Sequence, residues 1–402
     1  MHKGTTSQLV TIVVVATIML SSLVDLPRLI ALGPVSSLAF LTAAYAGSAG
    51  ILWMLRPIFV TPAFVALWPL LAFLAWIYST FLWYAPSVAG VQNVLVLSVF
   101  VGFVVLVSYE SYRTPGFAEL VLKMIVWAAW LAAILYLITL LASRLGVYVY
   151  MGPRSFAMVA MLGVACQLGA WRLGRSAALM QAVLLTVLIG ASFSRMALFV
   201  ALALFPLSRL SLRHFRSWAQ MVLLTAIIAS CTFLAVTYIK PLNERFFAGD
   251  RAYEVGDVTI NTSGRTEIWA TVWKSALNAP LTGQGAGSSE EVLLATDPTG
   301  AQHPHNDYLR ILHDYGLFGL SLWCLGYASL LWVIGISFVR SSREKDTEAA
   351  LHLAALLSLT GVALLMITDN TVVYVFVMAP LGALVGASLG RAGHQQRWRA
   401  HL

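Results

Sequence analysis

Long runs of apolar residues, separated by short polar connections, fill most of the chain. Each run is roughly 20 residues long, which is what an α-helix needs to span the apolar core of a bilayer. The pattern predicts an all-α polytopic membrane protein with about twelve transmembrane helices. The predicted spans are Leu9–Val24, Val35–Leu55, Pro62–Trp83, Val88–Ser108, Val121–Ala142, Phe156–Trp171, Ala177–Phe193, Met196–Ser208, Ala219–Ile239, Leu317–Val339, Ala349–Thr368 and Thr371–Leu389.

Lysine and arginine are distributed unevenly between the two sides of these spans. If the N-terminus is cytoplasmic, 15 of the 25 basic residues lie on the cytoplasmic side, 4 in short outer turns and 6 in one long outer segment. Short cytoplasmic loops of membrane proteins are enriched in these residues. The bias therefore predicts that both termini are cytoplasmic.

The predicted spans divide the chain into three regions: residues 1–239 with the first nine spans, 240–315 as one large outer loop, and 316–402 with the last three spans and a short tail. Within the loop, apolar residues recur at helical spacing over Arg265–Asn278, which predicts an amphipathic helix. The glycines over 283–287 predict a turn. A second helix is expected from Asn306 or Asp307 to Gly316.

The composition excludes an ordinary soluble enzyme. Of the 402 residues, 59% are hydrophobic and 10% charged, whereas soluble domains carry about 25% charged residues. The net charge of +8 is divided unequally, because the outer loop is net −4 and the remaining chain is +12. The basic balance therefore reflects membrane topology, and we expect contact with membrane lipids and none with nucleic acid.

Two histidines in the outer loop are the strongest candidates for chemistry. His303 and His305 stand just before the predicted helix N-terminus, which disfavours the imidazolium form. A neutral histidine there could act as a general base on a hydroxyl group. The alternatives are two histidines that only hydrogen-bond the loop, or zinc ligands together with Asp307 or His313. No fourth ligand stands at a familiar spacing, so we predict no metal and no cofactor.

Three further positions could bind or orient a substrate. Arg195 is a cation at the outer end of a span, against the positive-inside bias, and Arg265 opens the amphipathic helix. Each could instead be a lipid-facing or solvated charge. Two converging arginines would suit a diphosphate, because a guanidinium grips phosphate oxygens in a bidentate manner. Asp369 and Asn370 could orient an arginine or histidine, or form a plain turn.

A longer pattern resembles a known family. His305-Asn306, followed by Gly316 and Gly319, resembles the signature of bacterial lipopolysaccharide O-antigen ligases, whose superfamily includes O-antigen polymerases. Arg195 and Arg265 are similar to that superfamily's arginine positions, and the predicted topology agrees as well.

The resemblance implies a metal-independent glycosyltransferase with a membrane fold of the GT-C kind, acting at the periplasmic face of the bacterial inner membrane. Such an enzyme moves a glycan from undecaprenyl diphosphate to a sugar hydroxyl of lipid A–core. His305 would be the general base, and two arginines would hold the diphosphate. The remaining positions that the resemblance assigns to substrate binding are His303, Asn306, Arg310 and Asp369.

Two other activities remain open at this point. An O-antigen polymerase would use the same donor with a lipid-linked acceptor. A transporter would carry ionisable groups near the membrane midplane, whereas Glu110, Glu119 and Lys123 fall at the edges of predicted spans.

Overall fold

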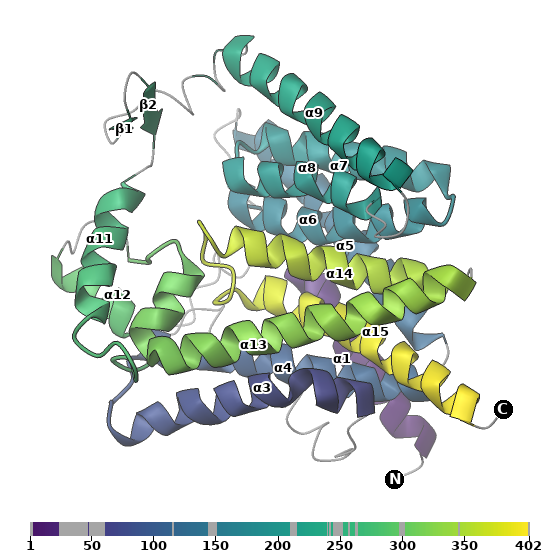
Figure 1. Ribbon diagram of the computed structural model, residues 1–402, viewed down its shortest axis with the longest axis horizontal. Coiled ribbons are helices and arrows are strands. Elements are labelled where there is room, and N and C mark those ends of the chain that lie inside the picture. The colour runs from purple at the N-terminus through teal and green to yellow at the C-terminus, as the bar shows by residue number, and fades with distance from the viewer. Residues whose placement is uncertain are drawn as a thin grey trace.

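The structure is a computed structural model and is almost entirely helical in the residues it describes. Figure 1 shows a bundle of long helices with a smaller helical part at one end. The described residues are 3–23, 47, 61–114, 116–143, 151–209, 215–238, 240, 243, 252–255, 258–261, 264–296, 302–344 and 346–400.

Every predicted span except Val35–Leu55 corresponds to a described helix; Val35–Leu55, apart from Gly47, lies outside the described residues. The helices are α1 (Lys3–Ser21), α3 (Thr61–Ser79), the short 3₁₀ helix η2 (Thr80–Leu82), α4 (Val88–Arg113), α5 (Phe117–Ser143), α6 (Pro153–Arg172), α7 (Ser176–Ala191), α8 (Arg195–Arg209), α9 (Phe215–Tyr238), α11 (Arg265–Ala276), α12 (Ser288–Thr296), α13 (Asp307–Glu344), α14 (Glu348–Leu365) and α15 (Val375–Ala400).

Seven of the described helices are long and apolar enough to cross a membrane, namely α3 with η2, α4, α5, α6, α13, α14 and α15. The chain is thus consistent with a polytopic membrane protein. Helices α1 and α7 are apolar but shorter, so the number of twelve spans stays a prediction.

Among the described helices, α4 and α15 share the most extensive contact. Gly382, Gly386 and Gly390 recur every four residues on α15 and face α4. A Cβ atom added at these glycines would lie 2.3–2.6 Å from backbone oxygens of α4. Small residues at this spacing let two helix backbones approach closely, which maximises van der Waals contact inside a membrane.

Helix α13 is interrupted at Gly316, where the backbone has φ 70° and ψ −176°. The break matches the predicted end of the loop helix and the start of the tenth span. The backbone N–H of Leu317 donates to the Pro280 carbonyl at 2.8 Å, and Trp76 Nε1 donates to the Tyr315 carbonyl at 2.9 Å. These bonds satisfy backbone groups near the break and hold this part of α13 against the loop and α3.

The loop contains more regular structure than its sequence predicts. The predicted helix is α11, and the glycines at 283, 285 and 287 all have positive φ, as a turn requires. Helix α12 was not predicted, and neither was the antiparallel hairpin of β1 (Ala252–Val255) and β2 (Val258–Asn261). The all-α prediction describes all the other regular structure in the described residues, and this short hairpin is an addition to it. The prediction omits these strands because they are only four residues long.

A small apolar cluster joins α11, α12 and the start of α13. Val272, Leu293 and Leu309 are buried together, and Ile268 and Trp269 pack against them. Figure 1 shows α11 and α12 beside the first turns of α13 at one end of the bundle. This cluster positions the polar residues described next.

Candidate active site

Three arginines stand in the first turns of three different helices. Arg154 follows Pro153 at the start of α6, Arg195 opens α8, and Arg265 opens α11. Local backbone conformation determines where each helix begins. Pro153 has a φ suited to a first helical turn. The turn before α8 contains Phe193 with φ 54°, and Gly264 before α11 has φ 75°. Neither α6 nor α11 has a side-chain cap. Their N-termini add positive potential to that of the arginines.

Arg154 holds a buried carboxylate and a histidine at once. Its Nη2 lies 2.8 Å from Asp369 Oδ1, its Nε donates to Asp369 Oδ2 at 3.3 Å, and Nη2 also lies 3.0 Å from His305 Nδ1. Burial raises the pKa of Asp369, while Arg154 and the backbone N–H of Asn370 oppose that rise. Asp369 therefore contacts an arginine, and its predicted role in substrate binding stays a prediction.

Arg265 belongs to the same site and has a buried N–H group, at Nε, without a hydrogen-bond partner among the described residues. Burial lowers its pKa; Asp369 opposes the effect, and Arg154 and Arg195 add to it. Asp369 is thus near both Arg154 and Arg265, and Arg195 is near Arg265. Arg154, Arg195 and Arg265 form one group, the arginine cluster.

His305 is held in an unusual backbone conformation beside this cluster. Its φ is 51°, a left-handed value that is uncommon for a residue other than glycine. Its backbone N–H donates to Asn370 Oδ1 at 2.9 Å, and the Asn370 Nδ2 lies 3.0 Å from its Nδ1. Burial and the charges of Arg154 and Arg265 lower the pKa of His305 to about 3. The imidazole is neutral at neutral pH, although burial rather than a helix N-terminus is the main cause.

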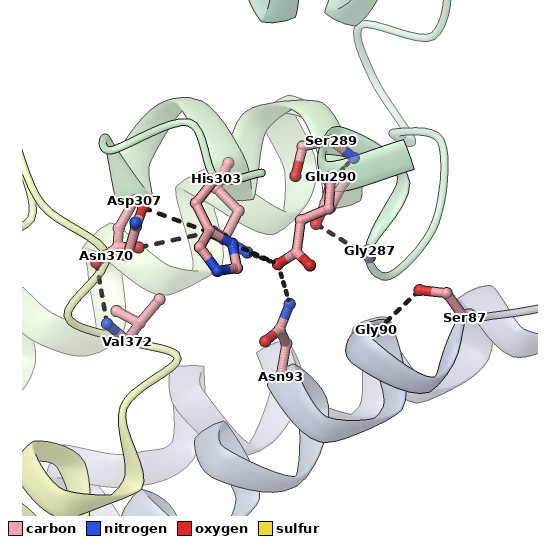
Figure 2. A network of polar contacts seen from close by, with 12 residues as sticks. Ser87, Gly90, Asn93, Gly287, Ser289, Glu290, His303, Asp307, Asn370 and Val372 are labelled. Carbon is pink, nitrogen blue, oxygen red and sulfur yellow. Dashed lines mark hydrogen bonds and ion pairs between the residues drawn. The ribbon is translucent and has the colours of Figure 1, made fainter. Parts of the chain in front are cut away.

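His303 belongs to a second polar group, drawn in Figure 2. Its Nδ1 lies 3.2 Å from Glu290 Oε1 on α12, and the same oxygen accepts from Arg310 Nη1 at 2.5 Å and from Asn93 Nδ2 of α4 at 3.1 Å. Burial raises the pKa of Glu290, but the hydrogen bond from His303 and the charge of Arg310 outweigh it and lower the pKa to about 2. Arg310 is almost fully buried, so it stabilises the position of Glu290 through their ion pair.

The first turn of α13 is anchored to the α14–α15 connection. Asn306 Oδ1 accepts the N–H of Leu309 at 2.9 Å and so caps the helix. Asp307 is buried, and its Oδ2 accepts the backbone N–H groups of Thr371 and Val372 at 2.6 and 2.9 Å. The sequence predicts substrate binding by Asn306, whereas its side-chain oxygen acts here as a helix cap. Substrate binding by this residue stays a prediction.

His313 lies apart from the other two histidines. It is fully buried, with Nδ1 3.1 Å from Ser288 Oγ and from Asp314 Oδ1, and Nε2 3.0 Å from Ser275 Oγ. Asp314 in turn accepts the N–H of Ser289 at the start of α12. Within the described ranges, no three His, Cys, Asp or Glu side chains are placed to hold a metal ion.

The structure thus brings together Arg195, Arg265, His305 and Asp369, and places His303 and Arg310 in an adjoining group. Sequence reasoning missed Arg154 and Glu290. Arg154 carries the same signal as Arg195, a cation on the outer side against the positive-inside bias. Glu290 gave no comparable signal, because an acidic residue in a polar loop is ordinary.

Comparison with protein-family models matches residues 180–324 to the family described as O-antigen ligase. The family resemblance is thereby confirmed. The O-antigen ligase match runs from α7 to α13 and includes Arg195, Arg265, His303 and His305, whereas Arg154 and Asp369 lie outside it. It indicates glycosyl transfer of the ligase or polymerase type. No curated protein sequence matches the chain.

Proposed function

We propose that this protein is an O-antigen ligase of the bacterial inner membrane, with its active site at the periplasmic face. It transfers a glycan from undecaprenyl diphosphate to a sugar hydroxyl of lipid A–core. The observation that supports this most is the arginine cluster, in which Arg154 contacts both the buried Asp369 and His305, at one end of a bundle of apolar helices. An enzyme must bind a lipid-linked diphosphate near the membrane surface, because the lipid stays in the bilayer.

The arginine cluster binds the diphosphate in this proposal. A guanidinium group can donate two parallel hydrogen bonds to the oxygens of one phosphate. The N-termini of α6 and α11, which have no side-chain cap, also favour an anion there. The unused Nε of Arg265 is one donor available to it. As the glycosyl bond breaks, the arginines stabilise the charge that develops on the leaving diphosphate. No metal is required for that task.

The acceptor hydroxyl loses its proton to a histidine of the His303–His305 pair, and the family motif points to His305. The hydroxyl oxygen attacks the anomeric carbon, and the electron pair of the broken bond leaves with the diphosphate. A single displacement of this kind inverts the configuration at that carbon.

Reconstitution tests the proposal directly. The purified protein is incubated in EDTA with an undecaprenyl-diphosphate glycan and lipid A–core, and the acceptor is followed by gel shift. We expect a shifted band, reduced roughly 10- to 100-fold in rate by Arg195→Lys or Arg265→Lys, since lysine cannot bind in a bidentate manner. Arg175→Lys, at an exposed residue at the other end of α6 and α7, is the matched control.

The other outcomes each identify a different activity. Longer glycans on the lipid carrier, with no product on lipid A–core, would identify a polymerase that uses the same donor. No product of either kind, beside an active control ligase, would refute glycosyl transfer and favour a transporter. A strict need for added metal would refute the metal-free mechanism.

A further inference from the structure

Helices α6 and α8 carry an arginine near each end. Arg154 and Arg195 stand in their first turns and belong to the arginine cluster, and Arg172 and Arg209 are their last residues. The two arginines are 18 residues apart in α6 and 14 in α8. At 1.5 Å per residue this is about 27 and 21 Å, most of the apolar thickness of a bilayer, which is about 30 Å. Arg172 and Arg209 therefore lie near the membrane surface opposite the candidate active site.

Each of these two arginines is oriented by the helix that carries the other. Arg172 Nη1 donates at 3.2 Å to the carbonyl oxygen of Ser208, the residue before Arg209. The Arg209 guanidinium lies over the ring of Trp171, the residue before Arg172, with Cζ 3.4 Å from the ring centroid. A carbonyl group and an indole ring orient the guanidinium groups, and these two contacts neutralise neither charge. The fold thus places two cations at one point between α6 and α8.

Two guanidinium groups so placed suit a phosphate group. Like charges brought together cost electrostatic free energy, and an anion that contacts both is attracted by both. The planar fork of a guanidinium matches the oxygens of a phosphate. Arg172 and Arg209 are half-buried, so each presents part of its side chain at the surface. Arg175, which is exposed in the turn between α6 and α7, adds positive charge nearby.

The surface next to the two arginines is suited to the acyl chains of a lipid. Helix α7 begins just after Arg175 and packs against both α6 and α8; Figure 1 shows the three helices side by side. Trp171 is of the residue type that is enriched where a membrane protein crosses the interface. Large apolar residues at helical spacing form one exposed face of α7, and they are Met180, Val183, Leu184 and Val187.

Arg113 shows the contacts of an arginine that only ends a helix. It is exposed at the end of α4, and its Nη1 donates at 3.2 Å to the hydroxyl of Tyr109, one turn back in the same helix. The negative end of the helix dipole is sufficient to favour a cation there. The contacts of Arg172 and Arg209 instead cross between two helices, which the helix dipole does not require.

We propose that Arg172 and Arg209 bind the phosphate of an anionic phospholipid in the leaflet opposite the candidate active site. Basic pockets between transmembrane helices are the usual sites for anionic lipid headgroups. The acyl chains of the lipid lie along the exposed face of α7. The bound headgroup joins α6 to α8 at one membrane surface, and the same two helices present Arg154 and Arg195 at the other. The site is separate from glycosyl transfer and does not depend on the proposed function.

Native mass spectrometry of the purified protein in detergent tests this site. Phosphatidylglycerol is titrated, and the Kd of the first bound lipid is measured. We expect Arg172→Gln and Arg209→Gln each to raise that Kd at least about tenfold, which corresponds to the loss of one hydrogen bond to a charged group. Arg113→Gln is the matched control, because it removes an arginine from another helix end on the same side, and its Kd should equal that of wild type. Thermal unfolding without added lipid verifies that all three variants fold.

Two further ligands distinguish a phospholipid from other occupants. Phosphatidylcholine with the same acyl chains should bind wild type more weakly than phosphatidylglycerol, because its headgroup has no net charge. Inorganic phosphate should not displace phosphatidylglycerol at equal concentration, because it lacks the acyl chains. Unchanged binding in Arg172→Gln and Arg209→Gln, or an equal loss in Arg113→Gln, would overturn the proposal. Equal binding of phosphatidylcholine would show that charge does not select the lipid, and displacement by phosphate would identify a site for the free ion; either result would also overturn it.

Discussion

Replacing Arg154 by lysine tests the site through a residue that the sequence alone did not identify. Arg154 makes a two-point contact with Asp369 and a third contact with His305 Nδ1. A lysine keeps the positive charge but reaches only one of these partners at a time. The expected consequence is a misplaced Asp369 and a His305 ring with one donor fewer.

The size of the effect follows from the two hydrogen bonds that a lysine at this position cannot make. A hydrogen bond to a charged group contributes about 1.5–3 kcal/mol, and the lower end applies because the Arg154 side chain is 39% exposed. Loss of two such bonds amounts to ~3 kcal/mol, and since 1.4 kcal/mol corresponds to a factor of ten, we expect kcat/KM to fall roughly 100-fold.

The assay is the initial rate of glycan transfer to lipid A–core at several donor concentrations, with protein in lipid nanodiscs. Arg175→Lys serves as the control, because it makes the same exchange at an exposed position away from the site. Thermal unfolding of both variants verifies that they fold. If Arg154→Lys transferred glycan within threefold of wild type, the three-point role of this guanidinium would be refuted.

Three further predictions follow from other parts of the molecule. Asp307→Ala should lower the unfolding temperature by several degrees, because it leaves the backbone N–H groups of residues 371–372 without an acceptor at a cost of about 1–3 kcal/mol each; unchanged thermal unfolding would contradict this. Gly386→Val should prevent α15 from packing on α4 and abolish expression of folded protein. Gly335→Ala should be tolerated, because a Cβ atom at that position has no neighbouring atom within 4 Å. The pKa of His305 is about 3 in the folded protein and about 6.5 in the unfolded chain. The free energy of unfolding is therefore highest above pH 6.5 and decreases as the pH falls toward 3, because the unfolded chain then binds a proton that the folded protein does not. The loss of thermal stability between pH 7 and pH 4 should therefore be smaller in His305→Gln, and equal losses would show that the ring is not protonated on unfolding.

The sequence predicted the helices well because the signal for each is local. An apolar run fixes its own helix, and Gly316 ends one helix and starts the next in the structure as it does in the pattern. The glycines over 283–287 marked their turn for the same reason. Helix α12 was missed because its nine residues include two adjacent glutamates and little apolar periodicity. Its position depends on Asp314, which accepts hydrogen bonds at its N-terminus from 25 residues away.

The sequence could identify the arginines as candidate binding residues, but it could not show that they lie close together. Positive charge on the outer side identified Arg195, and the start of the amphipathic helix identified Arg265. The first criterion applied to Arg154 would have added it. Whether such charges converge depends on the packing of α6, α8 and α11, which come from distant parts of the chain. The burial of Asp369 between them is a property of that packing.

The roles of the two histidines depend on still more distant contacts. In the sequence, His303 and His305 are two residues apart and chemically identical, and a family motif can favour one of them only by position. In the structure, Glu290 lies against one ring and Asn370 against the other, 13 residues before His303 and 65 residues after His305. The Glu290 carboxylate can only accept a hydrogen bond from His303, whereas the Asn370 amide nitrogen can only donate one to His305. The chemistry of each ring is therefore set by which neighbour the fold supplies, and not by the identity of the ring itself.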